Sequence, residues 1–168
     1  MFDITMFKRM SEKEKYENMV SMLEALIKDE EDSVANLSNA SAIIKTLMDR
    51  LNWCGFYFMK RGELVLGTFQ GMPACNRIKV GRGVCGTAVL ERKTIRVEDI
   101  HSFEGHIACD SASNSEIVIP IIKNNVVYGV LDIDSPEIGR FTELEQEYLE
   151  KCVEILNKYI IWEKICQI

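Results

Sequence analysis

Three of the six cysteines stand in polar, glycine-rich surroundings. They are Cys75 in GMPACNR, Cys85 in GRGVCGTAV and Cys109 in GHIACDSASNSE. A reactive thiol needs partial exposure and neighbouring groups that stabilise the thiolate. Cys85 lies where a glycine-rich turn opens a predicted helix, so backbone N–H groups are expected to lower its pKa. The three cysteines are therefore candidates for redox catalysis on a small molecule.

A metal site is the alternative interpretation of the same region. Its four ligands would come from the two histidines and three of the cysteines, namely His101, His106, Cys75, Cys85 and Cys109. Their spacing lacks the C-x-x-C and H-x-x-x-H pairs of structural zinc sites. We therefore favour redox chemistry and expect no metal, with His106 placed to support a thiolate at Cys109.

The remaining cysteines favour structural roles. Cys54 has aromatic neighbours in a predicted strand, and Cys152 is in phase with the apolar face of a predicted helix. Free cysteine behaves as a small buried hydrophobe in such places. Cys166 lies in a C-terminal tail that shows no pattern.

Carboxylates form the second group of candidates, on a predicted hairpin of residues 115–122 and 126–134. Side chains alternate across a strand, so one face of this hairpin is apolar. That face would carry Ile117, Ile119, Ile121, Val127, Gly129, Leu131 and Ile133. The pairing requires an odd loop at residues 123–125 or an equivalent bulge.

The opposite face of the hairpin then gathers three carboxylates. With the odd loop, Glu116 lies opposite Asp132, and Asp134 follows on the same face. Val118, Tyr128 and Val130 share this face, so the loop-rich middle of the chain is expected to cover it. Close carboxylates repel each other, so at least one pKa should rise. Such a cluster would meet a cation or hold a proton for transfer.

Composition limits the function classes. The 168 residues are long enough for one domain with a sizeable core, and the net charge of −6 argues against a nucleic-acid surface. No segment reaches the length of a membrane span, and the N-terminus lacks the pattern of a secretory signal. We expect a cytoplasmic protein that contacts neither nucleic acid nor membrane, with its cysteines reduced.

The order of predicted elements indicates an α+β fold. Two helices in residues 1–50 precede a sheet with catalytic loops in residues 51–141, and a helix in residues 142–168 closes the chain. Capping boxes begin the first and last helices, at Ser11 and Thr142. Short turns between strands indicate an antiparallel sheet with the N- and C-terminal helices on one side. A loop-covered pocket is expected on the other side.

Several segments together resemble the free methionine-(R)-sulfoxide reductases, small enzymes built on the GAF fold. The matching segments span residues 51 to about 145: LNWCGFYF, GTFQGMPACNRI, VGRGVCGTAV, FEGHIACDSASNSEIVIP, YGVLDIDSP and RFTELE. Generic GAF sensor domains do not normally carry the three cysteines. Two positions depart from the family pattern, Cys54 in place of a small aliphatic residue and Glu104 in place of proline.

The resemblance implies a single GAF-like domain and specific residue roles. Cys109 would be the nucleophile, with Cys75 and Cys85 as resolving and recycling thiols in either order. The substrate residues would be Glu116, Asp132, Asp134, Trp53 and Tyr57. It implies no cofactor beyond an external dithiol such as thioredoxin, free methionine sulfoxide as substrate, and a homodimer through the N-terminal helices.

The loops that carry two of these thiols are expected to move. A disulfide needs Cα atoms within about 7 Å, whereas substrate must first reach Cys109. Residues 71–83 and 102–113 are therefore predicted to act as a lid. The rival interpretations are a non-catalytic GAF ligand sensor, which would not need three thiols, and a metal- or redox-sensing protein.

Overall fold

A six-stranded antiparallel sheet forms the centre of the molecule, with strand order β3-β2-β1-β6-β5-β4. The structure is a computed structural model that describes residues 5–105 and 111–166. The strands are β1 (Trp53–Lys60), β2 (Glu63–Gln70), β3 (Arg77–Lys79), β4 (Ile95–Val97), β5 (Ser115–Lys123) and β6 (Val126–Ser135). The long central strands β1, β6 and β5 are mostly buried.

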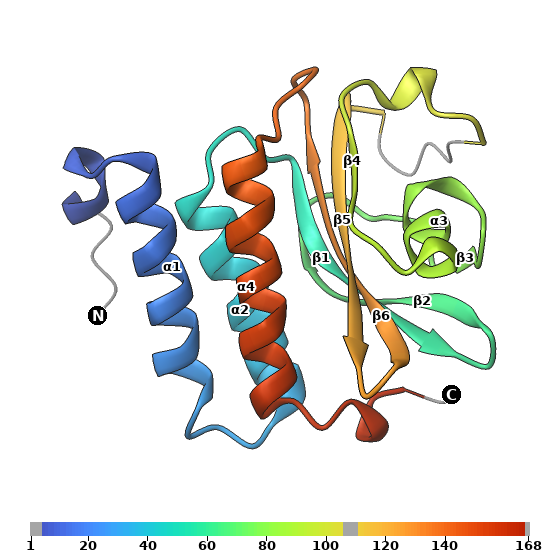
Figure 1. Ribbon diagram of the computed structural model, residues 1–168, viewed down its shortest axis with the longest axis horizontal. Coiled ribbons are helices and arrows are strands. Elements are labelled where there is room, and N and C mark those ends of the chain that lie inside the picture. The colour runs from blue at the N-terminus through green and yellow to red at the C-terminus, as the bar shows by residue number, and fades with distance from the viewer. Residues whose placement is uncertain (1–4, 106–110, 167–168) are drawn as a thin grey trace.

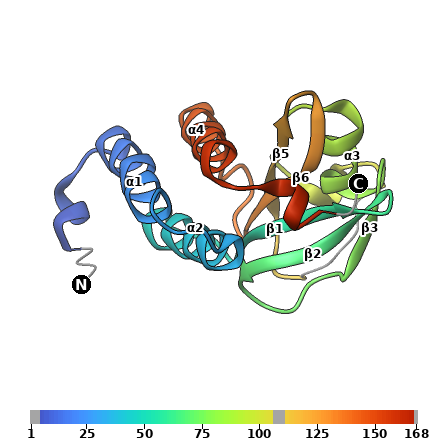
Figure 2. The same cartoon turned by 90° about the horizontal axis from the view of Figure 1, so that it is seen from below.

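Helices cover both faces of this sheet unequally. The helices α1 (Glu12–Ile27), α2 (Ser33–Leu47) and α4 (Glu143–Tyr159) lie on one side, and α3 (Gly83–Glu91) lies on the other (Figures 1 and 2). Short 3₁₀ helices complete the described chain: η1 (Thr5–Arg9), η2 (Ile100–Ser102) and η3 (Trp162–Lys164). None of the described helices is long and apolar enough to cross a membrane. The predicted α+β class, with the terminal helices on one side, is confirmed.

Both predicted capping boxes are present. The side chain of Ser11 accepts from the backbone of Glu14 at the start of α1, and Thr142 does the same with Glu145 at the start of α4. Each glutamate reaches back to the backbone N–H of its capping residue, so two otherwise unpaired donors are satisfied at each helix start.

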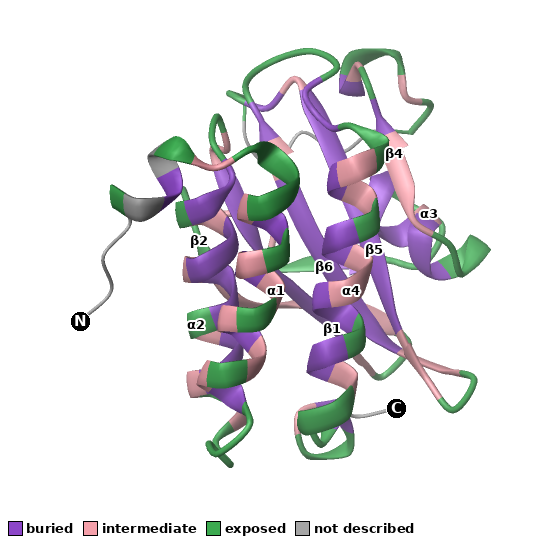
Figure 3. Ribbon diagram, turned by 60° about the vertical axis from the view of Figure 1, so that its left-hand side comes forward, coloured by how far each residue is buried: buried purple, intermediate pink, exposed green. Residues whose placement is uncertain are grey.

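Two apolar clusters fill the space on either side of the sheet. The larger one lies under α1, α2 and α4, and the smaller one lies under α3. Strand β1 contributes to both by simple alternation: Cys54, Phe56 and Phe58 face the larger cluster, and Trp53 and Tyr57 face the smaller. Figure 3 shows the buried strands behind helices whose exposed residues follow their outer faces. The predicted core positions of Cys54 and Cys152 are confirmed.

A buried ion pair fastens the helical layer to the end of the sheet. Arg140 contacts Glu145, and their side chains are only 2% and 3% exposed. Tyr16 of α1 donates a hydrogen bond of 2.8 Å to the same carboxylate, and Arg140 also donates to the Asp49 carbonyl at 2.9 Å. Because the charges are paired and hydrogen-bonded, they can be held away from water.

The β5–β6 hairpin reaches the required pairing by a bulge rather than by an odd loop. Asn124 and Asn125 form a two-residue turn in the left-handed region, and the register shifts between Ile121 and Ile122. Glu116 therefore lies opposite Asp134, and the predicted pairing of Glu116 with Asp132 is wrong by two residues. A shift of two keeps each side chain on its face, so the predicted gathering of carboxylates on one face holds.

The bulge also changes the far end of the hairpin. Val127 packs in the smaller cluster and Tyr128 in the larger one, the reverse of the predicted assignment. One extra residue exchanges the two faces of a strand beyond the point where it is inserted. The predicted positions of Leu131 and Ile133, on the near side of the bulge, are confirmed.

Candidate functional site

The side chains predicted to bind substrate come from three adjacent strands and share one face of the sheet. Trp53 of β1 pairs with Asp134 of β6, and Asp134 pairs in turn with Glu116 of β5. Directly paired residues on neighbouring strands point to the same side, and residues two apart do so as well. Asp132 and Tyr57 therefore lie on this face too, which is the side that α3 covers.

Helix α3 brings Cys85 down onto these carboxylates. Its first turn passes so close to the sheet edge that a Cβ on Gly86 would lie 2.3 Å from the carbonyl oxygen of Lys79. The glycine-rich entry also uses a positive φ of 61° at Gly83. Glycine is needed at both places, for close approach and for backbone conformation. The resulting packing leaves Cys85 only 3% exposed.

Cys85, Glu116 and Asp132 form a buried triad. One ligating atom from each lies within 4.8 Å of those of the other two, and Cys85 Sγ is 3.9 Å from Glu116 Oε1. Glu116 is 7% exposed and Asp132 is 6% exposed. No lysine, arginine or histidine within residues 5–105 and 111–166 forms an ion pair with either carboxylate.

Burial in the triad raises the pKa of both carboxyl groups. Burial, followed by the charges of Asp132 and Asp134, raises the pKa of Glu116 well above its usual value. Burial raises the pKa of Asp132 to about 6, against the opposing effect of its hydrogen bonds. The predicted rise in at least one carboxyl pKa is confirmed. Both carboxyl groups therefore hold a proton more tightly than an exposed carboxyl group does.

The expected low pKa of the Cys85 thiol is wrong. Burial, followed by the charges of Asp132 and Glu116, raises the pKa of this thiol well above its usual value. Desolvation and two nearby carboxylates outweigh the backbone N–H groups of the helix start. In the described geometry Cys85 is a protonated, buried thiol.

Cys75 lies in a loop that the two aromatic residues of β1 hold in place. Tyr57 donates from its hydroxyl to the carbonyl of Cys75 at 3.0 Å, and Trp53 donates from its indole nitrogen to the carbonyl of Met72 at 3.1 Å. Cys75 itself is half-buried and disulfide-bonded, whereas Cys85 is a free thiol. The two cysteines differ in state as well as in exposure.

Three stacked aromatic side chains, Trp53, Tyr57 and Phe69, form an aromatic wall beside the carboxylates, and Phe69 was not predicted from the sequence. Phe69 of β2 stacks on Trp53, with ring centroids 5.2 Å apart, and Trp53 stacks on Tyr57 at 5.9 Å. Phe69 reaches Trp53 because Gly55 has no side chain: a Cβ there would lie 2.3 Å from Phe69 Cβ. Gly55, which stands among the aromatic residues of β1, was the feature of the sequence that could have indicated an aromatic side chain packed across this position.

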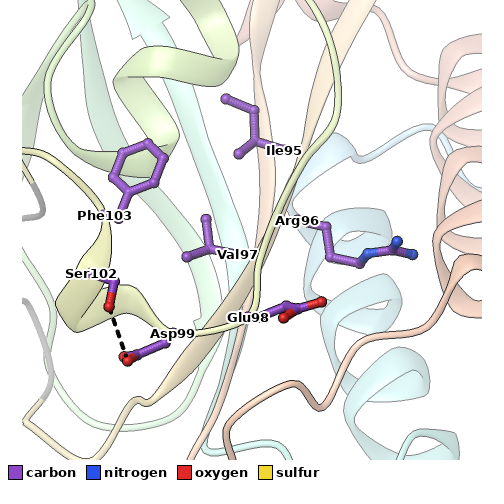
Figure 4. Close-up of a pocket in the computed structure, with 7 residues that line it drawn as sticks. All are labelled: Ile95, Arg96, Val97, Glu98, Asp99, Ser102 and Phe103. Carbon is purple, nitrogen blue, oxygen red and sulfur yellow. Dashed lines mark hydrogen bonds between the residues drawn. The ribbon is translucent and has the colours of Figure 1, made fainter.

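An open pocket of about 460 Å³ lies along β4 and η2. Figure 4 shows Val97 and Phe103 on one side of β4, with the Arg96 side chain turned away toward α4. Val97 pairs with Glu116 across β4 and β5, so this apolar wall adjoins the triad. The guanidinium of Arg96 lies 3.7 Å from Glu143 and so faces the other side of the sheet.

Comparison with known proteins identifies the family. The sequence matches the GAF domain family over residues 37–156. The chain belongs to the GAF domain family. It is 52% identical over 154 residues to protein YtsP of Bacillus subtilis, covering 90% of this chain and 94% of that protein. It is 48% identical over 151 residues to the free methionine-R-sulfoxide reductase of Escherichia coli, covering 90% and 92%.

A solved structure of a free methionine-R-sulfoxide reductase is also similar to this chain. The Neisseria meningitidis enzyme in complex with its substrate superposes with a TM-score of 0.88 at 39% identity. The match covers 93% of this chain and 94% of that one. The resemblance to the free methionine-R-sulfoxide reductases that the sequence showed is therefore confirmed.

Some predicted site residues of this GAF protein do not belong to the triad of Cys85, Glu116 and Asp132. Cys109 and His106 lie outside the described residues. His101 is exposed and its Nε2 contacts Asn114 Oδ1 at 2.9 Å. In the described part of the chain, the cluster with metal-ligand geometry is the Cys85 triad, which includes neither His101 nor Cys75. The ligand set considered from the sequence includes His106 and Cys109, so part of it lies outside the described residues.

Proposed function

We propose that this GAF protein reduces free L-methionine (R)-sulfoxide to L-methionine, with a dithiol as electron donor. The observation that carries the proposal is the buried carboxylate pair, Glu116 and Asp132, in a chain 48% identical to an enzyme of that name. A ligand-sensing GAF domain is the weaker alternative, because it needs neither the cysteines nor a buried pair of carboxyl groups.

The first chemical step is the attack of a Cys109 thiolate on the sulfoxide sulfur. The sulfoxide oxygen must be protonated before the sulfur–oxygen bond to methionine breaks, so an acid has to lie nearby. Glu116 is the proposed proton donor, because burial and the neighbouring charges of Asp132 and Asp134 raise its pKa and so favour its protonated form. The attack forms a sulfur–sulfur bond, and the protonated oxygen leaves the substrate sulfur as water. A water molecule then attacks Cys109 Sγ, methionine leaves with the electron pair of the sulfur–sulfur bond, and Cys109 becomes a sulfenic acid.

Asp132 and Asp134 have a different proposed task. Free methionine sulfoxide carries an ammonium group that a residue within a peptide lacks. Asp132 forms no ion pair among the described residues, so its carboxyl group suits that ammonium. A buried site built for an ammonium rejects a ligand that lacks one. The aromatic wall of Trp53, Tyr57 and Phe69 suits the thioether carbons.

Cys75 is the proposed resolving thiol. Its thiol condenses with the Cys109 sulfenic acid, which forms a disulfide and releases water. The disulfide-bonded state of Cys75 and the buried, free state of Cys85 support this order. A thioredoxin-like dithiol then reduces the disulfide, and movement of the Cys75 loop admits the next substrate.

The test is reduction of free L-methionine sulfoxide by dithiothreitol, with the (R)- and (S)-epimers assayed separately. The wild-type protein should act on the (R)-epimer alone, and Cys109→Ser should abolish that activity. Cys152→Ala, which removes a buried thiol in the helical core, is the matched control and should stay active. No turnover by fully reduced wild-type protein, or full activity in Cys109→Ser, would refute the proposal.

A further inference from the structure

The triad of Cys85, Glu116 and Asp132 has the composition of a site for a soft divalent cation. A thiolate sulfur and two carboxylate oxygens are all ligands that Zn²⁺ accepts. They come from α3, β5 and β6, so the packing of the core fixes their relative positions. The three ligating atoms lie within 4.8 Å of one another.

The spacing is close to what a tetrahedral ion requires. Zinc bonds of about 2.3 Å to sulfur and about 2.1 Å to oxygen place tetrahedral ligands roughly 3.6 Å apart. Cys85 Sγ and Glu116 Oε1 are 3.9 Å apart. The distance between Cys85 Sγ and Glu116 Oε1 would have to shorten by roughly 0.3 Å to match that value, and small rotations of the two side chains can supply this.

A second observation points to a missing positive charge. Oδ1 of Asp132 is buried and has no hydrogen-bond partner among the described residues. Buried polar atoms are normally paired, and one that is not calls for a ligand or a water. Because neither carboxylate of the triad has a cationic partner in residues 5–105 and 111–166, an incoming cation would supply the absent counter-charge.

We propose that Cys85, Glu116 and Asp132 bind one Zn²⁺ ion with an open fourth position. The ion would displace the protons of Cys85 and Glu116 to solvent. Val97, which lines the open pocket along β4, pairs with Glu116, so that pocket lies beside the site. Cys85 lies outside the Cys75 disulfide, so binding is independent of the redox state of Cys75.

The ion would also compete with the substrate of the proposed reaction. Zinc would occupy Asp132, the proposed partner of the substrate ammonium, and Glu116, the proposed proton donor. Only this competition rests on the proposed function, since metal binding is measured without turnover. Zinc should raise the apparent KM for the sulfoxide and leave kcat unchanged.

The test titrates Co²⁺ into the protein, freed of added thiols, in the reduced and in the Cys75-oxidised form. Both forms should bind one Co²⁺ with a near-ultraviolet thiolate-to-cobalt charge-transfer band, and Zn²⁺ should bleach that band. Cys85→Ser should lose the band, and Cys75→Ser, the matched control, should keep it. Asp132→Asn should keep the band but weaken Co²⁺ affinity roughly tenfold or more.

Three outcomes would overturn the site. No charge-transfer band in the wild type would show that the triad takes no metal. A band that survives Cys85→Ser would place the metal elsewhere. A band confined to reduced protein and lost in Cys75→Ser would place it on the redox cysteines. Far-ultraviolet circular dichroism identifies a variant that fails to fold, and Asp132→Asn then carries the test alone.

Discussion

Asp132 is a buried acid whose ionised form opposes folding. Burial raises its pKa from 3.8 to about 6. The folded state thus binds this proton more tightly than the unfolded state. The stability that this preference supplies is full below pH 3.8 and is lost as the pH rises through about 6. The rise from 3.8 to about 6 corresponds to roughly 3 kcal/mol at pH 8, because each tenfold change in proton affinity is worth about 1.4 kcal/mol.

The substitution Asp132→Asn removes this cost and keeps the shape of the side chain. Its unfolding free energy should exceed that of the wild type by an amount that grows by roughly 2–3 kcal/mol between pH 4 and pH 8. Urea unfolding of the reduced, metal-free proteins at both pH values measures that difference. Loss of the charge should also lower the pKa of Glu116, since Asp132 contributes to its rise.

The control for this prediction is Asp29→Asn, at an exposed aspartate in the loop between α1 and α2. Its difference from the wild type at the same two pH values gives the effect of an aspartate-to-asparagine change on the exposed surface. The reasoning is refuted if Asp132→Asn differs from the wild type by the same amount at both pH values. A variant that becomes less stable as the pH rises would refute it equally.

Three further substitutions test other parts of the structure. Tyr57→Phe removes the hydrogen bond to the Cys75 carbonyl. It should lower the free energy of unfolding in urea by about 1 kcal/mol and slow disulfide formation after one turnover. Unchanged values in both measurements would contradict a positioning role for Tyr57. Glu145→Gln leaves the Arg140 charge underpaired and should cost about 3–5 kcal/mol, so a loss below about 1 kcal/mol would contradict the structural role of this pair. Gly86→Ala forces a Cβ against the Lys79 carbonyl and should cost about 1–3 kcal/mol; an unchanged urea midpoint would show that α3 can move away.

Local signals in the sequence predicted most of the fold. The capping residues Ser11 and Thr142 and the alternation in β1 each act within a few positions, so the sequence alone carries them. The three-residue strand β3 (Arg77–Lys79) escaped prediction because it is a strand by virtue of its pairing with β2, which the local sequence does not report. A strand that short has no periodicity of its own to reveal it.

The site was harder to predict because its geometry depends on tertiary packing. The bulge near Ile121 decided whether Glu116 faces Asp132 or Asp134, and no residue type marks such a bulge unambiguously. The state of Cys85 depended on how deeply α3 buries it, which the local glycine pattern does not report. Alternation along the strands could gather the carboxylates on one face, but only the packed structure shows how deeply they are buried and hence that their pKa values rise.

The central claim is that the buried carboxylates recognise the ammonium of a free amino acid. The most direct measurement compares kcat/KM for free L-methionine (R)-sulfoxide with that for its N-acetyl derivative, which has the same sulfoxide and no ammonium. We predict that acetylation lowers kcat/KM by roughly two orders of magnitude or more. Equal values for the two substrates would contradict the role assigned to Asp132 and with it this account of the site.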